Sequence, residues 1–233
     1  MLTACNRSYH ITQHKERVYI IDSTGGLDSS LAKMLQPYKQ HMDSQFNIVL
    51  GRCDTILYKA QPECTLGNFM ADAQLQSAKG TDNNVIAAIV NYGGIRLPYI
   101  GAGDITLGKV YELMPFDNYV CIIDIPGDTM LKFINHMASY GGWPVSNIKY
   151  TIKDKHAEQI YIDEKRLDVH TTYHIAINDY LANGGDNCSF LTKLPQHTTN
   201  ILIRDVLINY IQQLTKQRKS LHPYIDNRVT NAK

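Results

Sequence analysis

The chain has 233 residues, of which 44% are apolar and 19% are charged. The apolar share is enough for a buried core, and the charged share is too low for a disordered chain. With 23 basic and 22 acidic residues the formal net charge is +1, which excludes a broad positive field. We therefore do not expect nucleic acid as a partner.

Residues 1–27 are predicted to form a lipoprotein-type N-terminus, a tether and a first strand. The segment Leu2–Cys5 has the form of a bacterial lipoprotein cleavage box, in which Cys5 would be lipidated. A chance match is the alternative, because the charged and apolar regions that should precede such a box are missing. The polar run Asn6–Arg17 favours the tether. We expect a lipid-anchored or periplasmic protein of the bacterial cell envelope, with membrane contact only through that anchor.

In chain order, the first half of the sequence predicts a strand at 18–22, a glycine turn at 23–26 and a helix at 28–41. A strand at 47–50, a helix at 66–78 and a fully buried strand at 85–90 follow. No run approaches the roughly 20 apolar residues that a membrane span needs, so we expect no span in the body of the chain.

The second half continues with a strand at 119–125 and a helix that Asp128 caps and Gly141–Gly142 ends. Strands are predicted at 148–152, 159–162 and 173–177, and a closing helix at 199–214. Because the elements lack a strict βαβ rhythm, they predict an α+β fold with mixed β-sheets and packed helices. We expect one domain over residues 28–233.

The five cysteines contain no Cys-x-x-Cys pair, which excludes zinc-ribbon and thioredoxin-like sites. They stand at positions 5, 53, 64, 121 and 188. If Cys5 carries lipid, the other four could form disulfides in an exported protein in three ways. Buried free thiols are an equally good interpretation.

Two segments follow strands with an asparagine, a Gly-Gly pair and a charged residue: Asn91–Arg96 and Asn183–Asp186. Adjacent glycines allow positive φ and close approach of a ligand, and successive N–H groups can form a concavity that accepts anions. An ordinary turn is the alternative.

A third candidate is the loop Met114–Asn118, in which a proline precedes Phe116. An aromatic ring in a polar loop can serve as a stacking platform for a nucleobase. A phenylalanine that fills the core is the alternative.

Five segments, taken in order, resemble the motifs of the C-terminal, substrate-binding domain of the 5'-nucleotidase family. They are Glu63–Asp72, Asn91–Arg96, Val110–Phe116, Leu181–Asp186 and His222–Arg228. The resemblance extends from about Asp28 to Arg228, and five ordered motifs are hard to obtain by chance. It implies the fold of that domain and recognition of a nucleoside or a nucleoside 5'-monophosphate.

The resemblance also implies roles for single residues. The base would lie between the rings of Phe116 and Tyr180, and Asp186 would accept hydrogen bonds from the ribose hydroxyls. Asn91 and Arg96 would contact the base and the ribose or phosphate. The full implied set of substrate-binding residues is Asn91, Gly93, Gly94, Arg96, Phe116, Tyr180, Asn183, Gly184, Gly185 and Asp186.

One departure concerns the phosphate. Family members usually carry a further arginine just before the Leu-Gly-Asn motif, where this chain has Lys59–Pro62. Recognition of phosphate is therefore expected to depend on Arg96.

In the resembled family a separate N-terminal metallophosphatase domain carries out hydrolysis with two metals. Its Gly-Asn-His-Glu or Asp and Gly-His-x-His motifs do not occur in this sequence, and Asp168–His170 matches only Asp-x-His. The histidine pairs His10/His14 and His170/His174 have metal-ligand spacing, but the first lies in the predicted tether and the second lies in a strand pattern without a third ligand nearby. We expect no catalytic residue, metal or other cofactor in this chain.

These observations predict the recognition domain of a 5'-nucleotidase-type hydrolase in nucleotide catabolism. A partner metallophosphatase subunit would hold the two divalent metals, and the chain alone would be inactive although its family is one of hydrolases. The first alternative is a non-catalytic cell-envelope lipoprotein that binds nucleosides or nucleotides. The second is an autonomous hydrolase, which metal-dependent release of phosphate from AMP would establish.

Overall fold

The computed structural model describes residues 13–19 and 28–232, apart from the side chain of His41. Cys5, the turn at 23–26 and most of the predicted first strand lie outside the described residues. Val18 and Tyr19 are described, and neither is in a strand. The chain divides into two units, Met1–His41 and Met42–Lys233. The domain boundary after residue 27 remains a prediction.

Helix α1 (Ser29–Phe46) begins one residue after Asp28 and extends past the predicted end at residue 41. The Asp28 carboxylate accepts hydrogen bonds from the N–H groups of Ser30 at 2.9 Å and Leu31 at 3.2 Å. These bonds satisfy donors that the first helical turn leaves free. No helix among the described residues is long and apolar enough to cross a membrane.

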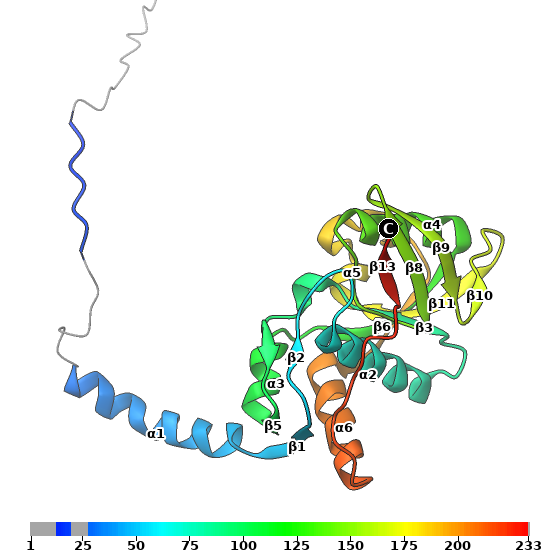
Figure 1. Ribbon diagram of the computed structural model, residues 1–233. Helices are drawn as coiled ribbons and strands as arrows, with labels where there is room; N and C mark the ends of the chain where they lie inside the picture. The colour runs from blue at the N-terminus through cyan, green and yellow to red at the C-terminus, as the bar shows by residue number, and fades with distance from the viewer. Residues whose placement is uncertain (1–12, 20–27, 233) are drawn as a thin grey trace, which may run out of the picture. The chain divides into compact units, whose positions relative to one another are not determined.

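A mixed five-stranded sheet with the order β12-β6-β11-β3-β7 lies at the centre of the unit Met42–Lys233 (Figure 1). Strands β3 and β11 are parallel, and the other neighbours are antiparallel. The expected α+β fold with mixed sheets is confirmed. The strands are β3 (Ala87–Ile89), β6 (Tyr119–Pro126), β7 (Val145–Ser146), β11 (Thr172–Asn178) and β12 (Gln196–Leu202).

The other strands of the described residues form three smaller sheets. A four-stranded sheet has the order β10-β9-β8-β13, and β1-β5 and β2-β4 are two-stranded. Their bounds are β1 (Val49–Cys53), β2 (Leu57–Tyr58), β4 (Tyr99–Ile100), β5 (Gly103–Thr106), β8 (Ile148–Lys153), β9 (His156–Ile162), β10 (Lys165–Arg166) and β13 (Val229–Asn231).

The remaining helices of this unit are α2 (Thr65–Thr81), α3 (Leu107–Leu113), α4 (Gly127–Ser139), α5 (Asp179–Ala182) and α6 (Ile203–Lys216). Short 3-10 turns are η1 (Tyr92–Gly94), η2 (Gly185–Asn187) and η3 (Ser189–Leu191).

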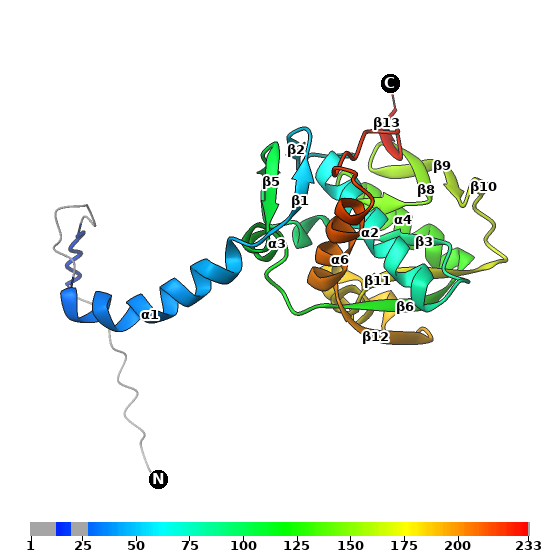
Figure 2. The same ribbon diagram turned by 90° about the horizontal axis from the view of Figure 1, so that it is seen from below.

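Two hydrophobic cores lie on opposite faces of the central sheet, because side chains alternate along a strand. On β3, Ala88 belongs to the core that contains α2 and α6. Its neighbours Ala87 and Ile89 belong to the core that contains α4, β8 and β9. Figures 1 and 2 show α4 beside β8 and β9, and α2 beside α6. The sheet is thus covered on both faces. An edge of the sheet where strands begin and end is left as a place for a site.

Two predicted helix starts are wrong. The closing helix begins at Ile203 and not at 199, because residues up to Leu202 belong to β12, which pairs with β6 through residues 196–198 and Leu202. Helix α4 begins at Gly127 with Pro126 as its N-cap, so Asp128 lies inside the first turn. Strand β6 runs directly into that helix and leaves no loop for a capping side chain. The predicted stop is confirmed, since Gly141 and Gly142 have φ of 86° and 100°.

The structure also tests the predicted strand at 47–50 and the state of four cysteines. The strand predicted at 47–50 is displaced to Val49–Cys53, where it pairs with β5. The cysteines at 53, 64, 121 and 188 are buried free thiols, and burial raises the pKa of each of them.

Candidate functional site

Three segments meet at one edge of the central sheet because of the strand directions. Strand β11 runs parallel to β3 with Ala176 opposite Ala88, so the segments that follow both strands leave at the same edge. Strand β6 is antiparallel to β11 with Val120 opposite Asn178, so the segment before β6 arrives there as well. The three predicted ligand loops are therefore neighbours in space.

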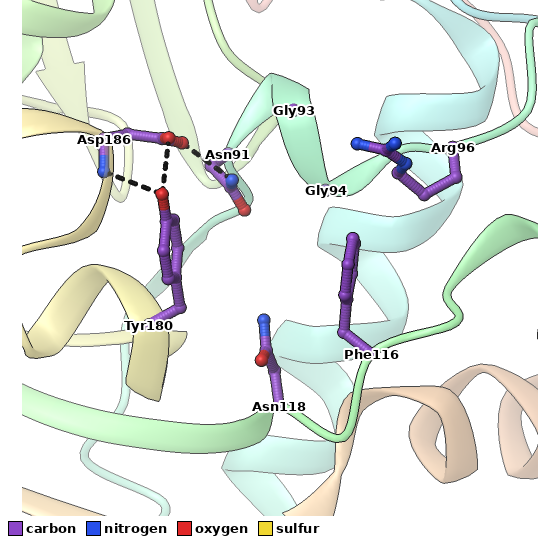
Figure 3. A pocket seen from close by; sticks show the side chains of 8 residues that line it. All are labelled: Asn91, Gly93, Gly94, Arg96, Phe116, Asn118, Tyr180 and Asp186. Atoms are coloured by element: carbon purple, nitrogen blue, oxygen red, sulfur yellow. Dashed lines mark hydrogen bonds between the residues drawn. The ribbon is translucent and has the colours of Figure 1, made fainter.

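A cavity of about 290 Å3 lies between these segments (Figure 3). This volume is at the lower end of the range typical of small-molecule sites. The cavity brings together seven of the ten predicted substrate-binding residues, and Asn183, Gly184 and Gly185 do not line it. Its lining residues are Asn91, Gly93, Gly94, Arg96, Phe116, Asn118, Tyr180 and Asp186.

Buried amides connect the cavity to the sheet. Asn178, the N-cap of α5, accepts a hydrogen bond from the Leu181 N–H at 2.8 Å and donates to the Asn91 side-chain oxygen at 2.9 Å. Asn91 in turn donates from Nδ2 to Asp186 Oδ2 at 2.7 Å. Because Asn91 and Asn178 are 5% and 1% exposed, this chain of bonds is shielded from water. It fixes the Asp186 carboxylate relative to both parallel strands.

Asp186 is also held by its own neighbours. The Tyr180 hydroxyl donates to Asp186 Oδ1 at 2.9 Å and accepts from the Asp186 N–H at 3.2 Å. The Asp186 carbonyl accepts from His136 Nε2 at 2.9 Å. These contacts stabilise a left-handed backbone conformation with φ 48° and ψ 38°, which non-glycine residues rarely adopt. The carboxylate forms the anionic end of the cavity.

The glycines act mainly through their small size. Of the four predicted glycines only Gly184 has a positive φ, at 91°. A Cβ on Gly185 would lie 2.4 Å from the Tyr180 ring, and one on Gly94 would lie 2.8 Å from Asn91 Oδ1. The missing side chains therefore let the ring and the amide approach the backbone. Asn183 is the C-cap of α5 and donates to the Asp179 carbonyl at 2.8 Å.

The other end of the cavity carries Phe116 and Arg96. The Phe116 loop is fixed by Arg204, which pairs with Asp117 at 2.7 Å and lies over the Tyr111 ring at 4.3 Å. The Arg96 guanidinium lies 5.4 Å from the Phe116 ring centroid. In the part of the chain that the structure describes, the Arg96 side chain makes no hydrogen bond or ion pair. Figure 3 shows the Phe116 and Tyr180 rings on opposite sides of the cavity.

Lys59 lies beside the same loop but does not line the cavity. Its ammonium group donates to the Ile95 carbonyl at 2.8 Å and lies 4.2 Å from the centroid of the Tyr92 ring. Burial, and then the charge of Arg96, lower the pKa of Lys59. Lys59 therefore supports the loop that carries Arg96.

Sequence reasoning missed two residues of the site, Asn118 and Asn178. Asn118 lines the cavity two positions after Phe116, and alternate side chains of an extended segment face the same side. That spacing was the available signal. Asn178 precedes the Tyr180 motif, and only its contact with Asn91, 87 positions away, reveals its role.

The first and last of the five sequence motifs, Glu63–Asp72 and His222–Arg228, bind each other, and these contacts lie outside the cavity. Arg228 is 9% exposed and binds both Asp72 oxygens, at 2.6 and 2.9 Å, and Asp226 at 2.7 Å. The Glu63 carboxylate accepts the N–H groups of Asp226 and Arg228. These motifs hold the C-terminal segment against α2.

Over residues 13–19 and 28–232, no group of three or more His, Cys, Asp or Glu residues could hold a metal ion. His174, one of the paired histidines, uses both ring nitrogens in hydrogen bonds to Asp124 and, at 2.9 Å, to Asp82. Its partner in the predicted pair, His170, is exposed.

Comparison with known proteins gives one family. The family described as 5'-nucleotidase, C-terminal domain, matches residues 49–193. The chain is 30% identical over 216 residues to a trifunctional nucleotide phosphoesterase protein of Bacillus subtilis, covering 84% of this chain and 14% of that protein. It is 28% identical over 196 residues to a 5'-nucleotidase of Vibrio cholerae, covering 79% of this chain and 34% of that protein.

A solved structure of a 5'-nucleotidase precursor from Thermus thermophilus has the same fold. The TM-score is 0.75 at 24% identity, over 87% of this chain and 43% of that chain. The present chain therefore spans less than half the length of each of these proteins.

Proposed function

The chain belongs to the family of the 5'-nucleotidase C-terminal domain, and we propose that its cavity binds a nucleoside or a nucleoside 5'-monophosphate. The observation that carries the proposal is the arrangement in Figure 3: two aromatic rings on opposite sides, a carboxylate at one end and an arginine without a polar partner in the described chain at the other. A flat base, a sugar with hydroxyl groups and an anionic group match these three features in turn.

The rings would hold the base. Phe116 and Tyr180 are 39% and 44% exposed, so each has a ring surface available to a ligand. Stacking on an aromatic side chain contributes about 1 to 3 kcal/mol per base and tolerates any base. The Asn118 amide, which lies between the rings in Figure 3, offers a donor and an acceptor to the base edge.

Asp186 and Arg96 would hold the rest of the ligand. A carboxylate accepts hydrogen bonds from sugar hydroxyls, and a guanidinium group donates to phosphate oxygens. Among the residues that the structure describes, Arg96 is the only such cation that lines the cavity. We expect a 5'-phosphate to add a modest gain in affinity, on the order of tenfold or less.

The hydrolytic chemistry would come from a separate metallophosphatase subunit with two divalent metals. Support for this comes from the names of the relatives, a nucleotide phosphoesterase and 5'-nucleotidases, and from the extra length of those proteins. Two metals activate water and stabilise the charge of the transferred phosphoryl group. In this arrangement the present chain contributes substrate recognition to nucleotide catabolism.

A pull-down from the native cell tests the partner. The tagged chain should capture a protein that gives the eluate metal-dependent release of phosphate from AMP. The matched bait Phe116→Ala should capture the same protein, while the eluate turns over AMP more slowly because the base is held less well. Capture without AMP hydrolysis would contradict the two-subunit proposal and favour a non-catalytic binding protein.

The cell-envelope location is a separate proposal that rests on Cys5. Lipidation should attach a labelled fatty acid to the chain in a bacterial host, and Cys5→Ser should abolish the label. A label that persists in Cys5→Ser, or no label on the parent chain, would contradict the lipid anchor.

A further inference from the structure

Besides its aromatic ring, Tyr180 offers a hydroxyl group that makes two hydrogen bonds to Asp186. It donates to Asp186 Oδ1 at 2.9 Å and accepts from the Asp186 N–H at 3.2 Å. The ring itself rests on Gly185, where any Cβ would come within 2.4 Å of it. A phenylalanine at this position would keep the ring and lose both hydrogen bonds.

The hydroxyl also determines which lone pairs of Asp186 remain open. A carboxylate has about four acceptor positions on its two oxygens. Tyr180 takes one position on Oδ1, and Asn91 takes one on Oδ2 at 2.7 Å. One position on each oxygen is left for the cavity. Two open acceptors on adjacent oxygens match two hydroxyl groups on adjacent carbons, a vicinal diol.

The loop around Asp186 has other supports, so the hydroxyl acts mainly on the carboxylate. His136 Nε2 donates to the Asp186 carbonyl at 2.9 Å, and the Cys188 N–H donates to the Gly185 carbonyl at 3.0 Å. Asn187 donates from Nδ2 to the Tyr140 hydroxyl at 3.0 Å. Loss of the Tyr180 hydroxyl would therefore leave the Asp186 carboxylate with Asn91 as its one remaining hydrogen-bond partner among the described residues, so that the carboxylate can rotate while these contacts keep the backbone in place.

We propose that the Tyr180 hydroxyl is a positioning group that fixes the Asp186 carboxylate and so makes the cavity selective for nucleosides that carry a vicinal diol. The selectivity part rests on the proposed nucleoside site. The positioning part concerns contacts within the chain and can be tested without any ligand.

The selectivity test compares Tyr180→Phe with the parent chain by calorimetric titration of adenosine and 2',3'-dideoxyadenosine. We expect the variant to bind adenosine about three- to tenfold more weakly and the dideoxy compound within about twofold of the parent chain. Equal losses for both ligands would mean that only the ring or the fold is affected. Unchanged adenosine binding would mean that the hydroxyl positions nothing. Either result overturns the proposal.

Tyr140→Phe is the matched control, because it removes a hydroxyl that contacts the same loop through Asn187 and leaves the Asp186 carboxylate untouched. Both affinities should stay as in the parent chain. A loss specific to adenosine in this control would assign the effect to the loop and would contradict the role given to Tyr180.

Crystal structures of the parent chain and Tyr180→Phe without ligand test the positioning part. We expect the Asp186 carboxylate of the variant in a second rotamer or in two conformers, over an unchanged backbone. A single carboxylate in the parent position would overturn this part. If the parent chain binds neither nucleoside, the proposed function and the selectivity both fail, while the crystal structures still decide the positioning role.

Discussion

The two ends of the cavity are built in different ways. At the anionic end, each Asp186 oxygen already accepts a hydrogen bond, from Tyr180 and from Asn91, and buried amides extend the chain of bonds to Asn178. At the cationic end, Arg96 lies over the Phe116 ring, and within the described residues it has no hydrogen-bond or ion-pair partner.

This difference separates selectivity from affinity. A carboxylate fixed by several bonds can distinguish ligands by the positions of their hydroxyl groups, since a misplaced donor finds no acceptor. A guanidinium group without such bonds can adapt to many anions but distinguishes them poorly. We infer that the anionic end determines which sugar binds, and that the cationic end adds affinity for a phosphate.

The largest expected effect is that of Asp186→Asn, which keeps the size of the side chain and removes its charge. Hydrogen bonds to a charged group are worth about 1.5 to 3 kcal/mol, so adenosine should bind about 10- to 100-fold more weakly. Calorimetry with 2',3'-dideoxyadenosine is the control, and its affinity should change little. Equal losses of affinity for both ligands would contradict the proposal that the anionic end of the cavity determines which sugar binds.

Phe116→Ala comes next, because it removes one stacking surface. We expect a loss of about 5- to 50-fold, equal for adenosine, 2',3'-dideoxyadenosine and AMP, since stacking is independent of the sugar and phosphate. Phe116→Tyr should retain the affinity of the parent chain. If Phe116→Ala binds all three ligands as tightly as the parent chain, the ring is not a base platform.

A smaller effect is expected for Arg96→Gln. The variant should bind adenosine like the parent chain and lose the preference for AMP, a change of about three- to tenfold that decreases as salt is raised. Parallel titrations of both ligands at two salt concentrations measure this difference. Equal weakening of adenosine and AMP would show that Arg96 supports the fold of the loop and not the phosphate.

The smallest expected effect is on protein stability. It comes from His174, which lies on strand β11 and does not line the cavity. Burial alone would lower the pKa of His174, but its hydrogen bonds and charge interactions with Asp124 and Asp82 outweigh burial and raise it above 6.5. A hydrogen bond from the Asn84 N–H, followed by that from His174, lowers the pKa of Asp82 below 3.8. The His174 contribution to stability is therefore fully present below pH 6.5 and is lost as the pH rises through the raised pKa. The Asp82 contribution is present above pH 3.8 and is lost at more acidic pH.

Thermal unfolding of His174→Gln checks this prediction. Its melting temperature should lie below that of the parent chain by no more than about 2 to 4 °C near pH 5 to 6, and the difference should shrink toward pH 9. The control His156→Gln, an exposed position on β9, should match the parent chain throughout. A difference that grows with pH would reverse the assigned sign. The ratio of adenosine to dideoxyadenosine affinity should not change.

The parts of the site that lie within one short segment could be predicted from the sequence. Asn91–Arg96, Phe116 and Asp186 follow or precede strands, and their residue types limit what they can do. The start of α6 was not predictable in this way, because residues 199–202 belong to β12, whose place in the sheet depends on the pairing of residues 196–198 and Leu202 with β6. The contact of His174 with Asp82 and that of Arg228 with Glu63 join positions 92 and 165 residues apart, and no local pattern reports them.

The most direct test of the account is one assay on the purified chain: titration with adenosine and AMP, with phosphate release from AMP measured in parallel in the presence of Mg2+, Mn2+ or Zn2+. We expect that both ligands bind and that no phosphate appears with any metal. Metal-dependent release of phosphate by the chain alone, or binding of neither ligand, would contradict it.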